Sequence, residues 1–383
     1  MKKFHVLTTA VAAAAFLAGC GGNDAGDQSP RVAFTQMVNF GDSLSDVGTY
    51  DVGVVKLAGG GHYSINGKGA TGLLYTNWTE FLAATLNIPQ PCAAETGLTP
   101  VAPFVQSVGD ETPTFHDAST GGTCLSYAQG GSRVVEAVGP GNAALLNPAD
   151  SSTYSNALGQ LTVPVVTQLN NYLLHNGGTF NSNQLVTVLA GGNDLFIDVA
   201  TFQAQVAGGV DQTTAATTAV TAMGTAGAQL AQLVNTEILA KGATHVVVVN
   251  IPDVSLTPFA IASGAAGQAL VKQMTQAFNQ QLQAGLTMGS TVVYVDAFTA
   301  SEDQATNMAQ YGLTDVSTPV CTSSSSLVCT DATLIAALTP STAGAPAAAA
   351  NTYEYADSVH PTPAGYRLLS ELVGEQLAIK GWL

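Results

Sequence analysis

Three side chains in this sequence have the types and spacing that nucleophilic catalysis requires. Ser43 follows the apolar run Met37–Phe40 and a glycine, so we expect it at a sharp turn between a strand and a helix. Asp357 precedes His360 by three residues, close enough for its carboxylate to hold the imidazole Nδ1–H. The other imidazole nitrogen is then free to take a proton from a serine hydroxyl. Together the three residues predict acyl transfer through a covalent intermediate.

Ordinary structural roles compete with this interpretation. Serine and aspartate are favoured helix N-caps in any protein, and Gly-x-Ser fragments such as the one around Ser43 are common. A further motif adds weight, because the buried strand predicted at Leu185–Ala190 leads through two glycines to Asn193. The carboxyl ends of strands are where open α/β sheets bind ligands. Gly130 and Gly131 would let an oxygen approach the backbone closely, or they merely form a turn.

In this order along the chain, the motifs resemble those of the GDSL family of serine esterases and lipases, also called SGNH hydrolases. The matching blocks are Gly41-Asp42-Ser43-Leu44, Gly191-Gly192-Asn193-Asp194 and Asp357-Ser358-Val359-His360-Pro361. A fourth block from Ser126 to Ser132 keeps the Ala-x-Gly-Gly core. It departs from the family at both ends, because the family usually has asparagine at the position of Ser126 and a small residue at the position of Ser132. The resemblance extends over residues 37 to 379.

The resemblance implies a role for each of these residues. Ser43 would be the nucleophile, His360 the base and Asp357 the residue that orients His360. The oxyanion would be held by the backbone N–H groups of Ser43 and Gly131 and by the side-chain amide of Asn193. The implied activity is hydrolysis of carboxylic esters, which are small molecules or lipids, and it requires no metal or organic cofactor.

The pattern of the whole chain predicts an α/β fold. Alternating strands and helices favour a right-handed parallel sheet covered by helices on both faces. The resemblance implies a three-layer α/β/α, flavodoxin-like arrangement around a central five-stranded parallel sheet. We expect strands near 37–40, 125–128, 185–190, 244–250 and 291–296, and helices near 44–57, 78–84, 163–174, 213–241, 262–286 and 363–379.

Domain organisation follows from what interrupts this pattern. Apart from the helix expected near 78–84, residues 58–122 have little regular pattern, and the same holds for residues 300–355, which predicts long loop insertions beside the site. No linker divides residues 35–383, so we expect a single domain.

The first residues resemble a bacterial lipoprotein signal. A basic start and an apolar run end in Leu17-Ala18-Gly19-Cys20. The resemblance implies removal of residues 1–19 and attachment of a diacylglyceryl group to Cys20, which would anchor the protein to the outer membrane or cell surface. The alternative is an ordinary signal peptide that is cut nearby, with release of the protein. Residues 20–34 then form a flexible tether.

The remaining cysteines predict disulfides. Cys92, Cys124, Cys321 and Cys329 allow three pairings, and an exported chain can oxidise them. We expect Cys92 to pair with Cys124 and Cys321 with Cys329, because each pair lies within one segment between motif blocks. Their spacing matches no zinc signature.

Charge and composition limit the classes of molecule that the protein is expected to bind. The formal net charge of −16 excludes nucleic acid and disfavours anionic lipid surfaces, whereas neutral lipids and soluble esters stay open. An acyltransferase, a phospholipase or a polysaccharide acetylesterase would use the same three residues. A non-enzymatic surface lipoprotein is the remaining alternative. The sequence carries no signal of oligomeric state.

Overall fold

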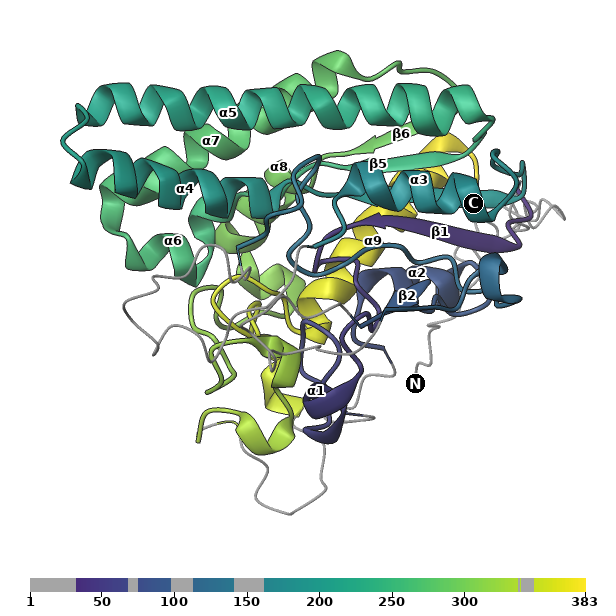
Figure 1. The fold of residues 1–383 in the computed structure, drawn as a ribbon. Coiled ribbons are helices and arrows are strands. Elements are labelled where there is room, and N and C mark those ends of the chain that lie inside the picture. Colours follow the sequence, from purple (N-terminus) through teal and green to yellow (C-terminus); the bar gives the residue numbers. More distant parts are fainter. Residues whose placement is uncertain (1–31, 68–74, 98–112, 141–161, 337, 339–347) are drawn as a thin grey trace, which may run out of the picture.

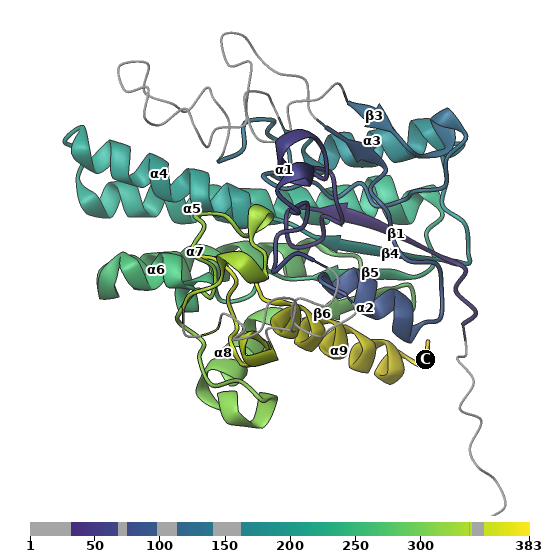
Figure 2. The same cartoon turned by 90° about the horizontal axis from the view of Figure 1, so that it is seen from below.

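The computed structural model describes residues 32–67, 75–97, 113–140, 162–336, 338 and 348–383. The predicted signal peptide, Cys20 and most of the predicted tether lie outside these residues, as do parts of both predicted insertions. In the described residues, one parallel sheet is covered by helices on both faces (Figure 1, Figure 2). The predicted α/β fold is therefore confirmed.

Four strands form this sheet in the described part of the chain. They are β1 (Gln36–Gly41), β4 (Gln184–Leu189), β5 (Val246–Val249) and β6 (Val292–Val295), in the order β1-β4-β5-β6. Every residue of β4 and β5 is buried, as parallel strands covered on both faces require. Gly41 at the end of β1 lies opposite Leu189 at the end of β4. Ser43 and Asn193, which follow these strands, therefore emerge at one edge of the sheet.

The strand expected at 125–128 is reduced to a single bridged residue. Ser126 forms isolated parallel bridges with Asn39 of β1 and with Ala93. The Tyr127 N–H donates to the Asn39 carbonyl at 2.8 Å. The segment around Ser126 thus occupies the position of a fifth strand beside β1. The chain turns at Gly130, and only isolated bridges form in place of a continuous ladder.

The helices form two layers whose cores follow the alternation of the strands. Val186 and Val188 of β4 face α3 (Val165–His175), α4 (Gly192–Ala207), α5 (Gln212–Leu233) and α7 (Gly264–Gly285). Leu185 and Leu189 face the opposite layer, which contains α2 (Trp78–Thr85) and α9 (Pro363–Lys380). Both views show α4 and α5 extending past the sheet on one side (Figure 1, Figure 2).

Shorter elements lie around the ends of the sheet. They are the helices α1 (Gly53–Leu57), α6 (Pro258–Ala262) and α8 (Ala297–Thr306), and the antiparallel pair of β2 (Glu95–Thr96) and β3 (Thr114–Phe115). The predicted helix at 213–241 continues after α5 as a π-helical turn, Val234–Ile238, and a 3₁₀ turn, Leu239–Lys241. It ends at Gly242, which has a φ of 94°.

Two sequence predictions were wrong in detail. No helix spans 44–57, and only α1 forms there. The Asp46 carboxylate instead accepts the N–H groups of Gly48 and Thr49 at 2.9 and 2.8 Å, and such local bonds favour a turn over a helix. The region 300–355 is also less irregular than expected, because α8 covers its first residues.

Both predicted disulfides are present. Cys92 bonds Cys124, and Cys321 bonds Cys329. The first ties the bridged segment to the chain before β2, and the second closes a short loop. In the described residues, no helix has the length and apolar character needed to cross a bilayer.

Candidate active site

The turn that carries Ser43 is shaped by Gly41 at the end of β1. Gly41 has a φ of 150°, and a Cβ there would lie 2.0 Å from the carbonyl oxygen of Leu189. Only glycine fits this approach of two strands. The Gln168 side chain of α3 holds the same residue, accepting its N–H at 2.9 Å and donating to its carbonyl at 2.8 Å. The strand end is therefore rigid where the chain turns into Ser43.

The loop before α9 positions His360. Thr362 caps α9 through its side chain, which accepts the Gly365 N–H at 3.3 Å, and Pro363 begins the helix. The Ala356 N–H donates to the His360 carbonyl at 2.8 Å, which closes the loop. A proline at the first helical position is preorganised for this start. The helix start therefore fixes the backbone of His360.

Asp357 both shapes this loop and holds the imidazole. Its Oδ1 accepts the backbone N–H groups of Val359 and His360 at 2.9 and 2.8 Å, and its Oδ2 accepts the Ser326 N–H at 2.7 Å. His360 Nδ1 lies 2.8 Å from Oδ2. Burial opposes ionisation, but the His360 charge and these hydrogen bonds outweigh it, so the pKa of Asp357 lies well below its ordinary value.

The hydroxyl of Ser43 meets the free nitrogen of this imidazole. His360 Nε2 lies 2.8 Å from Ser43 Oγ, although the two residues are 317 positions apart in the chain. Tyr63 covers the imidazole, with 4.7 Å between the ring centroids. The structure thus brings Ser43, His360 and Asp357 into one hydrogen-bonded row, the geometry in which a base activates a nucleophile.

Asp46 connects the nucleophile turn to the glycine pair and was not singled out by the sequence. Besides its two local bonds, its Oδ2 accepts the Gly130 N–H at 2.8 Å. That N–H is therefore unavailable to a substrate. The signal that could have found Asp46 is its place three residues after Ser43, directly before Val47 and Gly48, where an aspartate readily folds the following backbone.

The two glycines have different roles, which corrects the expectation that both make room for an oxygen. A Cβ on Gly130 would lie 2.3 Å from the hydroxyl oxygen of Tyr63, so the ring of Tyr63 fills that space. Gly131 has a φ of 84°, and its N–H donates to no acceptor within the described residues. The Ser43 N–H is likewise without an acceptor there. As far as the described part of the chain extends, both N–H groups can therefore donate to an oxyanion.

Asn193 and Asp194 at the start of α4 hold the segment after Gly131. The Asn193 Nδ2 donates to the Ser132 carbonyl at 2.8 Å, which orients the amide and leaves its second N–H free. Asp194 accepts from Arg133 Nε at 3.1 Å and from the Val134 N–H at 3.0 Å. These bonds join the Asn193 and Gly131 motifs directly.

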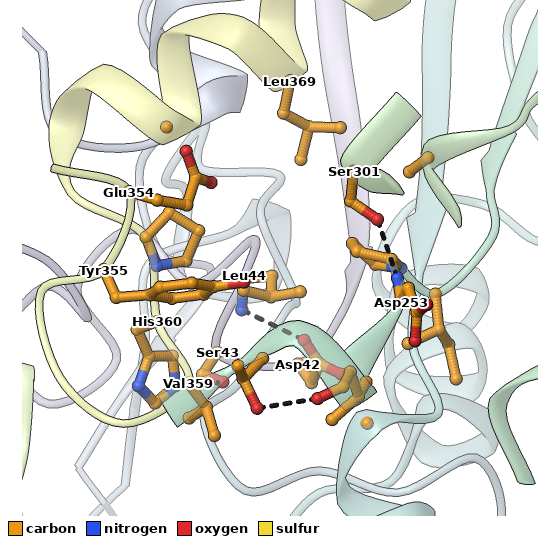
Figure 3. Close-up of a pocket in the computed structure, with 18 of the residues that line it drawn as sticks. Asp42, Ser43, Leu44, Asp253, Ser301, Glu354, Tyr355, Val359, His360 and Leu369 are labelled. Carbon is orange, nitrogen blue, oxygen red and sulfur yellow. Dashed lines mark hydrogen bonds between the residues drawn. The ribbon is translucent and has the colours of Figure 1, made fainter. Parts of the chain in front are cut away.

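A pocket opens beside Ser43 and runs between α8 and α9 (Figure 3). Ser43, His360 and Asn193 line it at the reactive end, and Leu369 lies on its α9 side. Most of its other lining is apolar, including Phe196, Ile251, Val254, Ala297, Ala300 and Leu372. Such a site can bury a hydrocarbon chain next to the reacting group.

Asp42 lies against this pocket and is unlike Asp357. Its Oδ1 accepts the Leu44 N–H at 3.0 Å, and the backbone N–H of Gly192 also favours the ionised form of this carboxyl. Burial raises its pKa to about 7, and the Leu44 hydrogen bond and the His360 charge offset this only in part. The carboxyl that directly precedes Ser43 is therefore largely protonated below neutral pH.

One family model matches the chain. It is described as GDSL-like Lipase/Acylhydrolase, and it matches residues 37–373. The chain therefore belongs to this hydrolase family, as its motifs indicated. No curated protein matches the chain. The two disulfides indicate an extracellular or periplasmic protein, since such bonds persist in oxidising compartments.

Proposed function

We propose that the protein hydrolyses carboxylic esters through an acyl-enzyme on Ser43. The observation that carries this proposal is the 2.8 Å approach of His360 Nε2 to Ser43 Oγ, with Nδ1 of the same ring held by Asp357. Membership of a lipase and acylhydrolase family supports the same chemistry. The apolar pocket beside the serine favours an ester with a hydrocarbon portion over a highly charged one.

The first half-reaction forms the acyl-enzyme. His360 Nε2 takes the Ser43 proton as Oγ attacks the ester carbonyl carbon, and the carbonyl π electrons move onto oxygen. The N–H groups of Ser43 and Gly131 and the free N–H of Asn193 surround the position of that oxyanion. When the intermediate collapses, the C–O bond to the alcohol breaks, and His360 returns the proton to the leaving alkoxide.

The second half-reaction reverses these proton movements with water. His360 accepts a proton from a water molecule that attacks the acyl carbon, and a second oxyanion forms at the same place. Breaking the bond to Oγ releases the carboxylic acid and returns the proton to Ser43. Asp357 keeps one tautomer of His360 throughout and stabilises the imidazolium that forms in both halves.

Hydrolysis of p-nitrophenyl esters from acetyl to palmitoyl tests this proposal. The signal-free protein should release p-nitrophenol, and Ser43→Ala should lose nearly all of that activity while unfolding at the same temperature. Rapid quenching followed by mass spectrometry should find the acyl group on the peptide that contains Ser43. Full activity in Ser43→Ala, or an acyl group on another residue, would contradict the mechanism.

We further propose that the protein is anchored to a membrane through a lipid on Cys20. The support is the lipobox-like sequence that ends at Cys20 and the export that two disulfides indicate. Expression with the native leader, followed by membrane fractionation, tests this proposal. Cys20→Ser should move the protein from the membrane fraction to the soluble fraction with its esterase activity retained. Equal membrane retention of both proteins would refute the anchor.

A further inference from the structure

Three carboxyl groups line the pocket, and two of them have partners. Asp42 accepts the Leu44 N–H at 3.0 Å. Asp253 Oδ1 accepts the Ser255 N–H at 3.0 Å, and its Oδ2, although it makes no hydrogen bond within the described residues, is paired with the Lys272 ammonium at 3.2 Å. These two groups are therefore explained by the fold itself.

The third carboxyl, on Glu354, has no such explanation. Its Oε2 is buried, and within the described residues it has no hydrogen-bond partner. The backbone of Glu354 is fixed on both sides, because its N–H donates to the Asp315 carbonyl at 2.9 Å and its carbonyl accepts the Thr362 N–H at 2.8 Å. In the view of Figure 3, the carboxyl lies on the α9 side of the pocket, beyond the Tyr355 ring as seen from Ser43.

The first turn of α9 makes room for this carboxyl. A Cβ on Gly365 would lie 2.7 Å from Glu354 Oε1, so any larger residue would displace it. Glycine within a helix costs about 0.5–1 kcal/mol relative to alanine. The chain thus uses a helix-destabilising residue beside an acid whose buried Oε2 has no hydrogen-bond partner among the described residues.

A buried carboxyl without a partner destabilises a folded protein unless something else bonds to it. Burial raises the pKa of Glu354 to about 7, so the group is a neutral acid over much of the acidic and neutral range. A neutral carboxylic acid donates one hydrogen bond and accepts others. The complementary ligand group is a hydroxyl, which can do both and enters an apolar pocket without carrying charge.

We propose that Glu354 is the polar contact of a substrate subsite, and that the ester bound in this pocket carries a hydroxyl on the portion lying along α9. This inference rests on the proposed ester hydrolysis. The apolar lining around Leu369 and Leu372 contacts the carbon chain, and Glu354 selects the hydroxyl. A chain with only methylene groups would leave the acid unpaired, which is the penalty that gives such sites their selectivity.

Binding to the inactive Ser43→Ala protein tests the subsite without requiring turnover. Calorimetry would compare methyl hexanoate with its 3-, 4-, 5- and 6-hydroxy derivatives, and hexyl acetate with the monoacetates of hexanediols, so that either half of the ester can present the hydroxyl. We expect at least one hydroxy ester to bind about tenfold more tightly than its parent. Methyl 6-aminohexanoate serves as the cationic probe.

Variants then assign the preference to one side chain. Added to Ser43→Ala, Glu354→Met should abolish the preference for the hydroxy ester, because methionine has a similar shape without a polar oxygen. Glu354→Gln should retain part of the preference. Glu371→Met makes the same chemical change on the exposed surface of α9, and it should leave the preference unaltered. Each variant should unfold cooperatively, as circular dichroism would show.

Three results would overturn the subsite. They are equal binding of every hydroxy ester and its parent, a hydroxyl preference that survives Glu354→Met, and tighter binding of the cationic probe than of any hydroxy ester. Hydrolysis by the wild-type protein separates this proposal from the previous one. A hydroxyl preference without Ser43-dependent turnover would refute the esterase alone, and Ser43-dependent turnover without a hydroxyl preference would refute the subsite alone.

Discussion

The carboxyl groups in two regions of the same pocket differ in the hydrogen bonds that they receive. In the catalytic row, Asp357 receives three backbone N–H groups and the imidazole of His360. On the α9 side of the pocket, three residues earlier in the chain, the buried Oε2 of Glu354 receives no hydrogen bond from the described residues. The first group is held as an anion, and burial favours the neutral form of the second. A carboxylate that receives its hydrogen bonds from the protein is held in a fixed position for catalysis, whereas a carboxyl without such bonds can bind a ligand.

The strongest test of the satisfied region is Asp357→Asn. The amide cannot accept the same set of bonds as an anion, and it favours the wrong imidazole tautomer, so kcat should fall by about 10⁴-fold. Stopped assays with a p-nitrophenyl ester would measure the loss, and the melting temperature would confirm that the fold is intact. A loss of less than tenfold would show that Asp357 serves the loop and not the chemistry.

A smaller effect is expected at the oxyanion position from Asn193→Ala. Loss of one donor that faces the oxyanion should lower kcat by about 10²–10³-fold with little change in KM. The same change also removes the bond to the Ser132 carbonyl. Asn193→Asp is the matched control, because it keeps the size of the side chain and lacks the donors. Equal activity of the wild type and both variants would exclude Asn193 from the oxyanion site.

Gly130→Ala should have an intermediate effect through Tyr63. The new methyl group would collide with the Tyr63 ring, which covers His360, so we expect about a tenfold loss of kcat and about 1–3 kcal/mol of destabilisation. Adding Tyr63→Ala to Gly130→Ala removes the collision. The double variant should therefore lose less stability than the sum of the two single changes in chemical unfolding. If the stability losses of the two single variants add up in the double variant, the new methyl group does not clash with the Tyr63 ring.

The smallest effect is a change in how stability depends on pH. Because folding raises the pKa of Glu354 from 4.5 to about 7, its contribution to stability is fully present below pH 4.5 and is lost as the pH rises through about 7. Glu354→Met has no titratable group at this position, so its stability does not fall in this way as the pH rises. The stability of the variant relative to the wild type should therefore rise between these pH values. Thermal unfolding across that range measures the difference, and a constant difference would show that Glu354 is solvated or paired.

Much of the fold and the reactive row could be predicted from local patterns. Buried strands such as Leu185–Ala190 are continuous apolar runs, and the start of α9 has a capping threonine followed by proline, so both are encoded within a few residues. The Asp357–His360 spacing places carboxylate and imidazole together in any compact turn. Segments whose form depends on distant partners were predicted poorly, as the missing helix after Ser43 shows.

The sequence by itself indicated the candidate catalytic residues, the parallel sheet and the two disulfides, because each depends on short motifs, periodicity or nearby cysteines. Only the tertiary structure decided that His360 Nε2 and Ser43 Oγ, from residues 317 positions apart in the chain, lie 2.8 Å from each other. It also decided that Tyr63 occupies the space at Gly130 and that Glu354 lines the pocket with an Oε2 that no other described residue bonds. Burial and the absence of a partner are properties of a packed interior. They arise from contacts between distant segments, which no local pattern specifies.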